Sequence, residues 1–532
     1  MTDTNKSAAL AQLIQSGSAH FQAGRFSEAE AACHQALAVD AENAAALDLL
    51  GRIALKAGQL QRAAEFFNRA LALNPNDAKV YRDLGMALAT QGDWAAALVQ
   101  FRRALEIDPA YADGHIGAGN AYFAQEHFEE ALACYRRALQ ITPESAKAHG
   151  NLGIVLQRLG RLDEAVECYQ RALSHDPDFI DAYKNLASVF QNLGRLDEAI
   201  ACANKLMQLQ PGSALVQGKF APLLLLYGDL ERGLALYESR FGGADKSLMA
   251  LLQRNLARLE GKPRWQGEAL QERRLFVWRE QGFGDGIMMA RYLPLLKAKG
   301  AGEVIVSCWP EMMSLLGTLP EVDRVVDDRE ALPPQEFDCH CPIMSLPYLF
   351  GTRLDTIPDT VPYFNVPRVM AEKWTQRLAP LEGLKVGLVW SGHKNQRKDM
   401  VRSIPFEHLK RLLALPGIRF VSLQKDEAEN DAALLDWMAE CEDFLDTAAL
   451  VQPLDLVISV DTAVAHLAGA LGRPVWLLNR FESEWRWMLE REDSPWYPTM
   501  RIFRQSALHD WGSVIQEVAE ELGRLVARQA GN

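Results

Sequence analysis

The chain has 532 residues, of which 48% are hydrophobic and 23% are charged. These proportions are typical of a globular protein, and the length corresponds to three or four domains of about 150 residues each. The formal net charge of −13 argues against a general binder of nucleic acid or of anionic membranes. The composition therefore predicts no nucleic-acid partner.

The sequence carries no signal for secretion, membrane insertion or metal binding. Its first ten residues are polar, and its longest apolar run, Leu223 to Tyr227, is far shorter than the roughly 20 residues of a membrane span. Cys339-His340-Cys341 resembles a ligand cluster, but its spacing is not that of a zinc knuckle and no second cysteine pair faces it. We expect a cytoplasmic protein with no membrane span and no metal.

A small residue recurs every 34 residues through the first half of the chain, at Gly17, Gly51, Gly85, Gly119, Gly153, Ala187 and Ala221. Turn glycines, aromatic residues and closing prolines keep the same period, for example Gly58, Phe67 and Pro75. This combination resembles the tetratricopeptide repeat. Small residues let two antiparallel helices approach closely, and the proline ends the second helix. We therefore assign residues 10–245 to an all-α superhelix of six to seven repeats, which usually forms a binding surface.

Beyond this array, residues 246–270 are predicted to form a linker helix. Short β-branched runs then alternate with helical segments, which indicates parallel sheets. The predicted strands are Leu275–Arg279, Glu303–Cys308, Asp323–Val326, Phe337–His340, Lys385–Trp390, Arg419–Leu423, Asp455–Val460, Pro474–Leu478 and Met500–Phe503. The proline-rich segment Ile357–Pro367 separates two Rossmann-like halves, 271–367 and 368–525. Such halves bind ligands at the carboxyl ends of their strands.

The first half opens with a glycine-rich turn between a strand and a helix. Gly282 and Gly284 follow the strand Leu275–Arg279, and Asp285 lies where the helix begins. Glycines at such a turn let the backbone approach a ligand closely. Asp285 has two interpretations, an ordinary helix cap or a catalytic base at the mouth of the cleft.

The second half contains a sharper turn of the same kind. The strand ending at Val460 runs into Asp461, Thr462 and Ala463, where a helix begins. Free backbone N–H groups and the helix dipole at Thr462 and Ala463 would attract a diphosphate. His466 lies one helical turn further on, and it could either add a hydrogen bond to this ligand or belong to the core.

These two turns resemble the signature turns of the bacterial heptosyltransferase-like glycosyltransferases. The matching segments are Gly282–Asp285 with Arg291–Pro294, Ser459–Thr462 with His466-Leu467, Val386–Gly392 and Arg402–Pro405. The whole arrangement resembles bacterial tetratricopeptide-repeat glycosyltransferases and is similar in plan to the eukaryotic O-GlcNAc transferase. The resemblance implies a GT-B fold, a nucleotide-sugar donor, inversion at the anomeric carbon and no metal or other cofactor.

The resemblance also implies roles for individual residues. Asp285 corresponds to the general base, and the donor diphosphate falls at Thr462, Ala463 and His466. Arg402 falls where the heptosyltransferases place a phosphate-neutralising lysine, beside the basic residues Lys394, Arg397 and Lys398. The remaining donor-site candidates are Gln424 and Lys425, placed to meet nucleotide or phosphate, and Asp461, which could orient the turn or contact the sugar.

The repeats are expected to select the acceptor. Asp83, Asn151 and Asn185 occupy one equivalent position on the first helices of their repeats, and the resemblance to the O-GlcNAc transferase suggests that such side chains hold an extended peptide. We therefore prefer a protein or peptide acceptor over a glycan or lipid-linked one.

Three positions depart from the relatives. Ala463 stands where the heptosyltransferases usually have glycine, and Gly286 and Met288 stand where the repeat-bearing relatives usually have a hydroxyl residue and a glutamine. The loss of two polar groups beside Asp285 leaves an alternative open, in which the protein is an interaction scaffold that binds a nucleotide without transferring a sugar.

Overall fold

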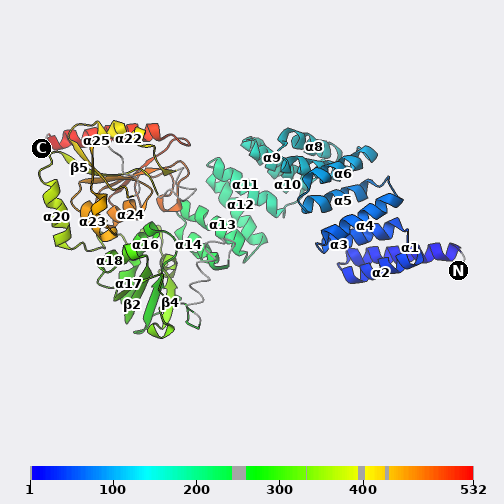
Figure 1. The fold of residues 1–532 in the computed structure, drawn as a ribbon, viewed down its shortest axis with the longest axis horizontal. Helices are drawn as coiled ribbons and strands as arrows, with labels where there is room; N and C mark the ends of the chain where they lie inside the picture. Colours follow the sequence, from blue (N-terminus) through cyan, green and yellow to red (C-terminus); the bar gives the residue numbers. More distant parts are fainter. Residues whose placement is uncertain are drawn as a thin grey trace. The chain divides into compact units, whose positions relative to one another are not determined.

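A computed structural model describes residues 3–242, 259, 261–330, 332–392, 402–425 and 431–530 (Figure 1). The basic residues Lys394, Arg397 and Lys398 and most of the predicted linker helix lie outside these ranges. The chain divides into two compact units, Met1–Pro211 and Gly212–Asn532. Throughout the described part of the chain, no helix combines the length and the apolar character needed to cross a bilayer.

The first unit consists of antiparallel helix pairs, as the 34-residue period predicts. Its helices are α1 (Asp3–Gln22), α2 (Phe26–Val39), α3 (Ala44–Lys56), α4 (Leu60–Leu73), α5 (Ala78–Thr90), α6 (Trp94–Ile107), α7 (Ala112–Ala124), α8 (Phe128–Ile141), α9 (Ala146–Arg158), α10 (Leu162–His175), α11 (Ile180–Asn192) and α12 (Leu196–Leu209). Their ends follow local chemistry. Asp77, for example, caps α5 by accepting a hydrogen bond from the backbone N–H of Lys79 at 3.0 Å.

The periodic small residue and the periodic aromatic residue contact each other in four of the helix pairs, those of Gly51, Gly85, Gly119 and Gly153. A Cβ atom at Gly51 would lie 2.5 Å from the ring of Phe67, and one at Gly119 would lie 2.7 Å from the ring of Tyr135. Only glycine leaves room for the ring at this distance, so the pattern in the sequence is a packing contact. The turn glycines serve the backbone instead, since Gly58 has a φ of +72°, a conformation that costs glycine little.

The next helix pair, α13 (Ala214–Leu226) and α14 (Leu230–Tyr237), follows the 34-residue period but belongs to the second unit. Leu225, Leu230 and Leu234 are almost fully buried in the same apolar core as Val277 of the first sheet. A short 3-10 helix, η1 (Glu238–Gly242), continues from α14. The pair is a repeat by sequence and part of the second unit by packing.

The N-terminal half of the second unit contains a parallel sheet with the described strand order β3-β2-β1-β4. Its strands are β1 (Arg274–Trp278), β2 (Glu303–Cys308), β3 (Arg324–Asp327) and β4 (Cys339–Pro342). The helices are α16 (Phe283–Met289), α17 (Leu293–Ala298), α18 (Pro310–Leu316) and α19 (Leu346–Leu349), with short 3-10 helices η2 (Ala290–Tyr292), η3 (Pro334–Glu336), η4 (Ile343–Ser345) and η5 (Leu354–Thr356).

The C-terminal half contains a second parallel sheet with the described order β10-β9-β8-β5-β6-β7. Its strands are β5 (Leu384–Val389), β6 (Ile418–Ser422), β7 (Leu434–Asp436), β8 (Leu456–Val460), β9 (Val475–Asn479) and β10 (Met500–Arg504). The helices are α20 (Arg368–Leu378), α22 (Phe406–Leu413), α23 (Phe444–Val451), α24 (Ala463–Ala470) and α25 (Trp511–Ala530), with η6 (Met438–Glu440) and η7 (Trp485–Trp487).

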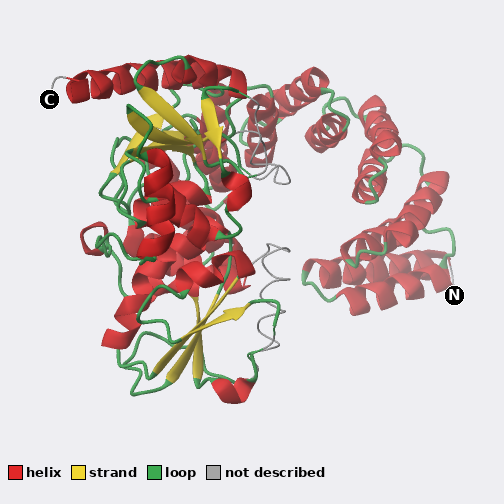
Figure 2. Ribbon diagram, turned by 60° about the vertical axis from the view of Figure 1, so that its left-hand side comes forward, coloured by secondary structure: helices red, strands yellow, loops and turns green. Residues whose placement is uncertain are grey.

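Read from β7, the second sheet has the doubly wound Rossmann order, and the first sheet has the first four strands of that order. The helices α16, α18, α23 and α24 lie between the two sheets (Figures 1 and 2), and one apolar core continues from β1 through these helices to β8. The predicted fold class, an all-α array followed by an α/β region of two Rossmann-like halves, is confirmed.

Candidate functional site

A cavity of about 1280 Å³ lies at the carboxyl ends of strands from both sheets. One wall is the turn after β1, from Gln281 to Asp285, and another is the turn after β8, from Asp461 to Val464. Residues of α13 and η1 also line it. The sequence-predicted residues that line this cavity are Gly282, Gly284, Asp285, Arg402, Gln424, Lys425, Asp461, Thr462, Ala463 and His466.

Asp285 is held from two sides. One carboxylate oxygen, Oδ2, accepts a hydrogen bond from the backbone N–H of Gly282 at 3.1 Å, which closes the first turn of α16. The other oxygen, Oδ1, forms an ion pair with the guanidinium of Arg486, and both side chains are only about one-eighth exposed. Asp285 is therefore the third residue of a capping box on α16, whose N-cap is Gly282, and it lies in the wall of the cavity; its role as a catalytic base stays a prediction.

Gly284 brings the two halves into contact. A Cβ atom at this position would lie 2.7 Å from Cδ2 and 3.2 Å from Nε2 of His466. The absence of a side chain at Gly284 thus lets α16 and α24 pack directly on each other. The φ of Gly282 is −83°, a value that other residues also adopt, so the backbone conformation does not require glycine at this position. The sequence predicts that glycine at this turn lets the backbone approach a ligand closely. At Gly284 the structure instead shows a close approach to His466.

His466 is buried, with 3% of its surface exposed, yet it borders the cavity. Its Nδ1 atom lies 2.9 Å from the hydroxyl of Tyr497, and its ring packs on Trp487 with centroids 4.9 Å apart. Burial, aided by the positive charges of Arg486, Arg291 and Arg402, lowers the pKa of His466 well below its usual range. The ring is therefore neutral near pH 7 and can act as a hydrogen-bond donor or acceptor.

The N-terminus of α24 faces the same cavity. Thr462 is the N-cap residue, but its hydroxyl lies 2.9 Å from the hydroxyl of Ser459 and makes no cap hydrogen bond to the helix. The first N–H groups of the helix therefore remain oriented along its axis, where they favour an anion. Ala463 adds one methyl group at this edge.

Arg402 and Asp461 lie beside this helix N-terminus. Arg402 Nη1 donates to the backbone carbonyl oxygen of Asp461 at 2.8 Å, which fixes the guanidinium near the turn. Burial raises the pKa of Asp461, although the charges of Arg486 and Arg402 act in the opposite direction. A cation and the start of a helix thus lie together, an arrangement suited to phosphate oxygens.

Gln424 and Lys425 line the cavity, but the side-chain oxygen of Gln424 and the ammonium of Lys425 already bond to the protein. The Gln424 side-chain oxygen accepts hydrogen bonds from the backbone N–H groups of Trp390, at 3.3 Å, and Ser391, at 3.1 Å. Lys425 Nζ donates to the carbonyl oxygen of Cys441. Gln424 is 6% exposed. We therefore interpret it as a residue that holds the loop after β5 in place.

Arg486, Arg480 and Glu484 are cavity-lining residues that our sequence analysis missed. Arg480 Nη2 donates to Glu484 at 2.7 Å, and Arg486 Nη1 lies 3.8 Å from the same carboxylate. All three follow β9, the strand next to β8. A charged cluster just beyond a buried strand was the available signal, and it is weak because such residues are common in surface loops.

A buried ionic cluster ties η1 to the turn that carries Asp285. Glu280, 1% exposed, accepts two hydrogen bonds of 2.8 Å from the guanidinium of Arg240. Arg240 also donates to Glu238 and Ser345, each at 2.7 Å. Next to Glu280, the amide of Gln281 donates to the hydroxyl of Tyr237. The helix pair α13–α14 with η1 therefore positions the catalytic-base candidate.

Gly286 and Met288, the two departures from the relatives, do not line the cavity. Met288 is fully buried in the core between the sheets. A Cβ atom at Gly286 would lie 3.1 Å from the side chain of Met312, on the same inner side. Both positions therefore contribute to packing, and the polar groups absent here would face the apolar core.

Two of the three predicted acceptor residues of the array, Asp83 and Asn151, have local partners. Asp83 is 6% exposed and forms an ion pair with Arg82 at 2.8 Å. The Asn151 amide donates to the side-chain oxygen of Asn120 at 2.8 Å, and Asn185 is half-buried. The carboxylate of Asp83 is buried and paired, and the expectation that these residues hold a peptide stays a prediction.

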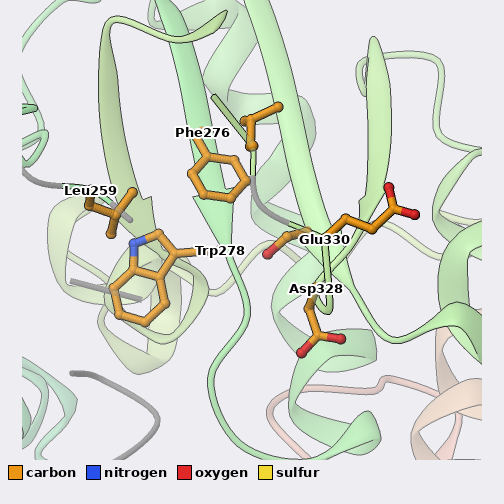
Figure 3. A pocket seen from close by; sticks show the side chains of 7 residues that line it. Leu259, Phe276, Trp278, Asp328 and Glu330 are labelled. Atoms are coloured by element: carbon orange, nitrogen blue, oxygen red, sulfur yellow. The ribbon is translucent and has the colours of Figure 1, made fainter. Parts of the chain in front are cut away.

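A second, small hollow lies on the first sheet and shares no residue with the cavity. Figure 3 shows its lining, where the apolar side chains of Leu259, Phe276 and Trp278 stand opposite Asp328 and Glu330. Its space of about 20 Å³ is close to that of one water molecule. Among the residues that the structure describes, no group of three or more His, Cys, Asp or Glu side chains is arranged to hold a metal ion.

Comparison with protein families gives two kinds of match. Models of the tetratricopeptide repeat match residues 14–78, 50–116, 146–179 and 168–201, and a related repeat model matches 119–160. The model of glycosyltransferase family 9 (heptosyltransferase) matches residues 438–505. The chain joins tetratricopeptide repeats to a heptosyltransferase-like glycosyltransferase region. The family 9 match contains α24, His466 and Arg486 of the cavity wall.

Among curated proteins, the chain is similar to protein FlbA of Caulobacter vibrioides, with 30% identity over 344 residues. This match covers 59% of the chain and 56% of FlbA, so the chain spans little more than half the length of this relative. Among solved structures, a tetratricopeptide repeat protein from Parabacteroides merdae matches 46% of the chain and 98% of its own, with 19% identity and a TM-score of 0.38. Pseudomonas aeruginosa PilF matches 39% and 95%, with 18% identity and a TM-score of 0.36.

Proposed function

We propose that this protein transfers a sugar from a nucleotide-sugar donor to an acceptor hydroxyl, with inversion and without a metal ion. The observation that carries the proposal is the shared cavity, in which Asp285 of the first half and the N-terminus of α24 in the second half form adjoining walls. The family 9 match over residues 438–505 supports the donor side. The similarity to FlbA, at 30% identity, extends over 59% of the chain.

The donor diphosphate would bind at the N-terminus of α24. Backbone N–H groups there, the guanidinium of Arg402 and the neutral ring of His466 offer hydrogen bonds to phosphate oxygens. These groups would stabilise the negative charge that develops on the departing nucleoside diphosphate, which is the task a metal ion performs in other enzymes.

Asp285 would act as the general base. It would accept the proton of the acceptor hydroxyl while that oxygen attacks the anomeric carbon from the face opposite to the diphosphate. An ionised carboxylate at the edge of a cavity is suited to this task, and a general base typically contributes about 10²–10⁴-fold to the rate.

A protein or peptide acceptor would enter beside α13. Ala214, Gly218 and Pro222 lie four residues apart on this helix and all line the cavity, so they offer a wall of small side chains. Leu215, which follows Ala214 on α13, is 60% exposed. Tetratricopeptide repeats commonly bind proteins, and the array that precedes α13 in the chain would supply further contacts with the acceptor.

The first test is binding followed by turnover. A panel of nucleoside diphosphates and nucleotide sugars would be screened by thermal unfolding, since a ligand at 100 times its dissociation constant stabilises the folded state by about 2.7 kcal/mol. With the donor found, Asp285→Ala should lower turnover by about 10²–10⁴-fold, and Arg402→Gln should weaken donor binding. Glu442→Gln, which removes an exposed carboxylate from the rim, is the matched control. Metal chelation should leave turnover unchanged.

The outcome separates the transferase from the scaffold alternative. A scaffold that binds a nucleotide would show the thermal shift, but it would release no nucleoside diphosphate from any donor. Turnover of Asp285→Ala within a few-fold of the wild-type protein would refute the role of Asp285. The packing of Met288 in the core and of Gly286 against Met312, away from the cavity wall, supports the transferase over the scaffold.

A further inference from the structure

The contact between Arg486 and Asp285 joins two groups that the transfer reaction needs separately. Arg486 lies on η7 in the C-terminal half, 201 residues from Asp285 in the chain. Its guanidinium forms the ion pair with Asp285 Oδ1, lies 3.5 Å from the side-chain oxygen of Gln281, and has its charge centre 4.9 Å from the ring centroid of Trp485. One cation therefore holds the turn that carries the candidate base.

In this state Asp285 is poorly placed to accept a proton. Its Oδ2 atom is engaged by the N–H of Gly282, and its Oδ1 atom by Arg486. Each carboxylate oxygen thus already has a partner, and an acceptor hydroxyl would have to compete with these partners for Asp285. Efficient proton transfer therefore requires the guanidinium to move away from Asp285.

The same guanidinium is close to the predicted diphosphate site. Arg486 lies 3.8 Å from Glu484 and borders the cavity together with Asp461 and His466. Its charge is among those that act on both Asp461 and His466, the two titratable groups beside the N-terminus of α24. A diphosphate bound there would place two or more negative charges near a cation that is now paired with the carboxylates of Asp285 and Glu484.

We propose that Arg486 is shared between Asp285 and the donor diphosphate, so that donor binding draws it away and releases the base. This inference rests on the proposed function. In the transfer step, the acceptor oxygen bonds to the anomeric carbon and the bond from that carbon to the diphosphate oxygen breaks. The acceptor proton moves to Asp285, and the nucleoside diphosphate leaves with the bonding electron pair. Arg486 then neutralises the leaving group, and Asp285 becomes competent only when a donor is present.

The inference predicts an unusual binding result, because Asp285 and the ligand compete for one cation. Asp285→Asn should bind the nucleoside diphosphate more tightly than the wild-type protein, by about 3–10-fold, since the guanidinium no longer has to leave a carboxylate. Arg486→Gln should bind it about 10–100-fold more weakly. In the Arg486→Gln background, the further change Asp285→Asn should have no additional effect, because the competition is gone.

The experiment measures the dissociation constant of the nucleoside diphosphate selected by the thermal screen, by calorimetry, on the full chain. Glu442→Gln removes one negative charge from the rim of the same cavity and controls for a general change in potential; its affinity should stay within about 2-fold of wild type. If Arg486→Gln fails to fold, the comparison of Asp285→Asn with Glu442→Gln still tests whether Asp285 competes with the ligand for Arg486.

Two outcomes would overturn the inference. Unchanged or weaker binding by Asp285→Asn would mean that Arg486 only holds the turn, and the proposed function would survive. Binding of no nucleoside diphosphate by any variant would reject the inference and the proposed function together.

Discussion

One exposed ion pair of the repeat array differs from two buried ion pairs of the second unit in both burial and range. In the array, Arg161 and Glu164 are three residues apart in the chain, 2.7 Å from each other, and 38% and 52% exposed. In the second unit, Arg240 and Glu280 are buried and 40 residues apart, and Arg486 and Asp285 are 201 residues apart. The array is thus built from local contacts, whereas the site depends on contacts that only the complete second unit can make.

The largest expected effect comes from cutting the chain at two places. A fragment of residues 212–532 should fold and bind the nucleoside diphosphate, because it keeps α13, α14 and η1 with their buried leucines and Arg240. A fragment of residues 246–532, cut where the repeat pattern ends, should not fold. Glu280 loses its partner Arg240, and the apolar core loses the buried leucines of α13 and α14. Circular dichroism and nucleotide binding check both. Equal behaviour of the two fragments would contradict the assignment of α13–α14 to the second unit.

The second effect concerns the two kinds of ion pair. Glu280→Gln should lower the free energy of unfolding of the second unit by about 3 kcal/mol, since it leaves the buried charge of Arg240 with Glu238 alone. The same change at Glu164, on the surface of α10, should leave stability unchanged. Urea unfolding of both variants measures the difference. A similar loss at both positions would show that burial does not distinguish them.

The third effect compares one substitution in two places. Gly119→Ala places a methyl group 2.7 Å from Tyr135, and Gly284→Ala places one 2.7 Å from His466. Both should destabilise their units by about 1–3 kcal/mol through overpacking. Only Gly284→Ala should also weaken nucleotide binding, because it displaces His466 at the cavity. Calorimetric titration separates the two, and weakened binding in Gly119→Ala would contradict the comparison.

The smallest effect is a pH dependence within the array. Burial, and then the negative charge of Asp83, raise the pKa of Asp48 to about 6. A carboxyl group whose pKa is higher in the folded state than in the unfolded state stabilises the fold at pH values below its unfolded-state pKa, which is near 4. This stabilisation is lost as the pH rises through about 6. Asp48→Asn should therefore stabilise the array relative to wild type at pH 7 and much less at pH 4. Unfolding at both values checks this, and a pH-independent difference would exclude Asp48 as the cause.

The strands of the second unit were predicted within one or two residues, because each is a short apolar run ending in a turn. Phe337–His340 was displaced by two residues from β4, since Cys339 to Pro342 continue the buried run. β7 was missed, because Leu434–Asp436 is only three residues long and pairs at the edge of the sheet. Periodicity needs more residues than this to be recognised.

The candidate site was only partly readable. Both turns were found because a glycine-rich or polar segment follows a buried strand, and the cavity brings Asp285 and His466 to adjoining walls. Arg486 was not found, because a single arginine between two tryptophans has no pattern of its own. Arg486 matters because it pairs with the carboxylate of Asp285, and the sequence of residues 480–490 gives no indication of that partner.

The sequence by itself determined the helix pairs of the array, since a small residue recurs every 34 residues and, in four of the pairs, the glycine and the aromatic ring that meet lie within one such period. It also determined the two Rossmann-like halves and the two turns that line the cavity. Only the tertiary structure decided that α13–α14 belongs to the second unit, that Asp83 is paired, that Gln424 holds a loop and that Arg486 meets Asp285. The physical reason is the separation of the contacting residues along the chain. The residues that pack within a repeat are close in sequence, whereas the charges that pair across the cavity are far apart in sequence and meet only in the folded chain.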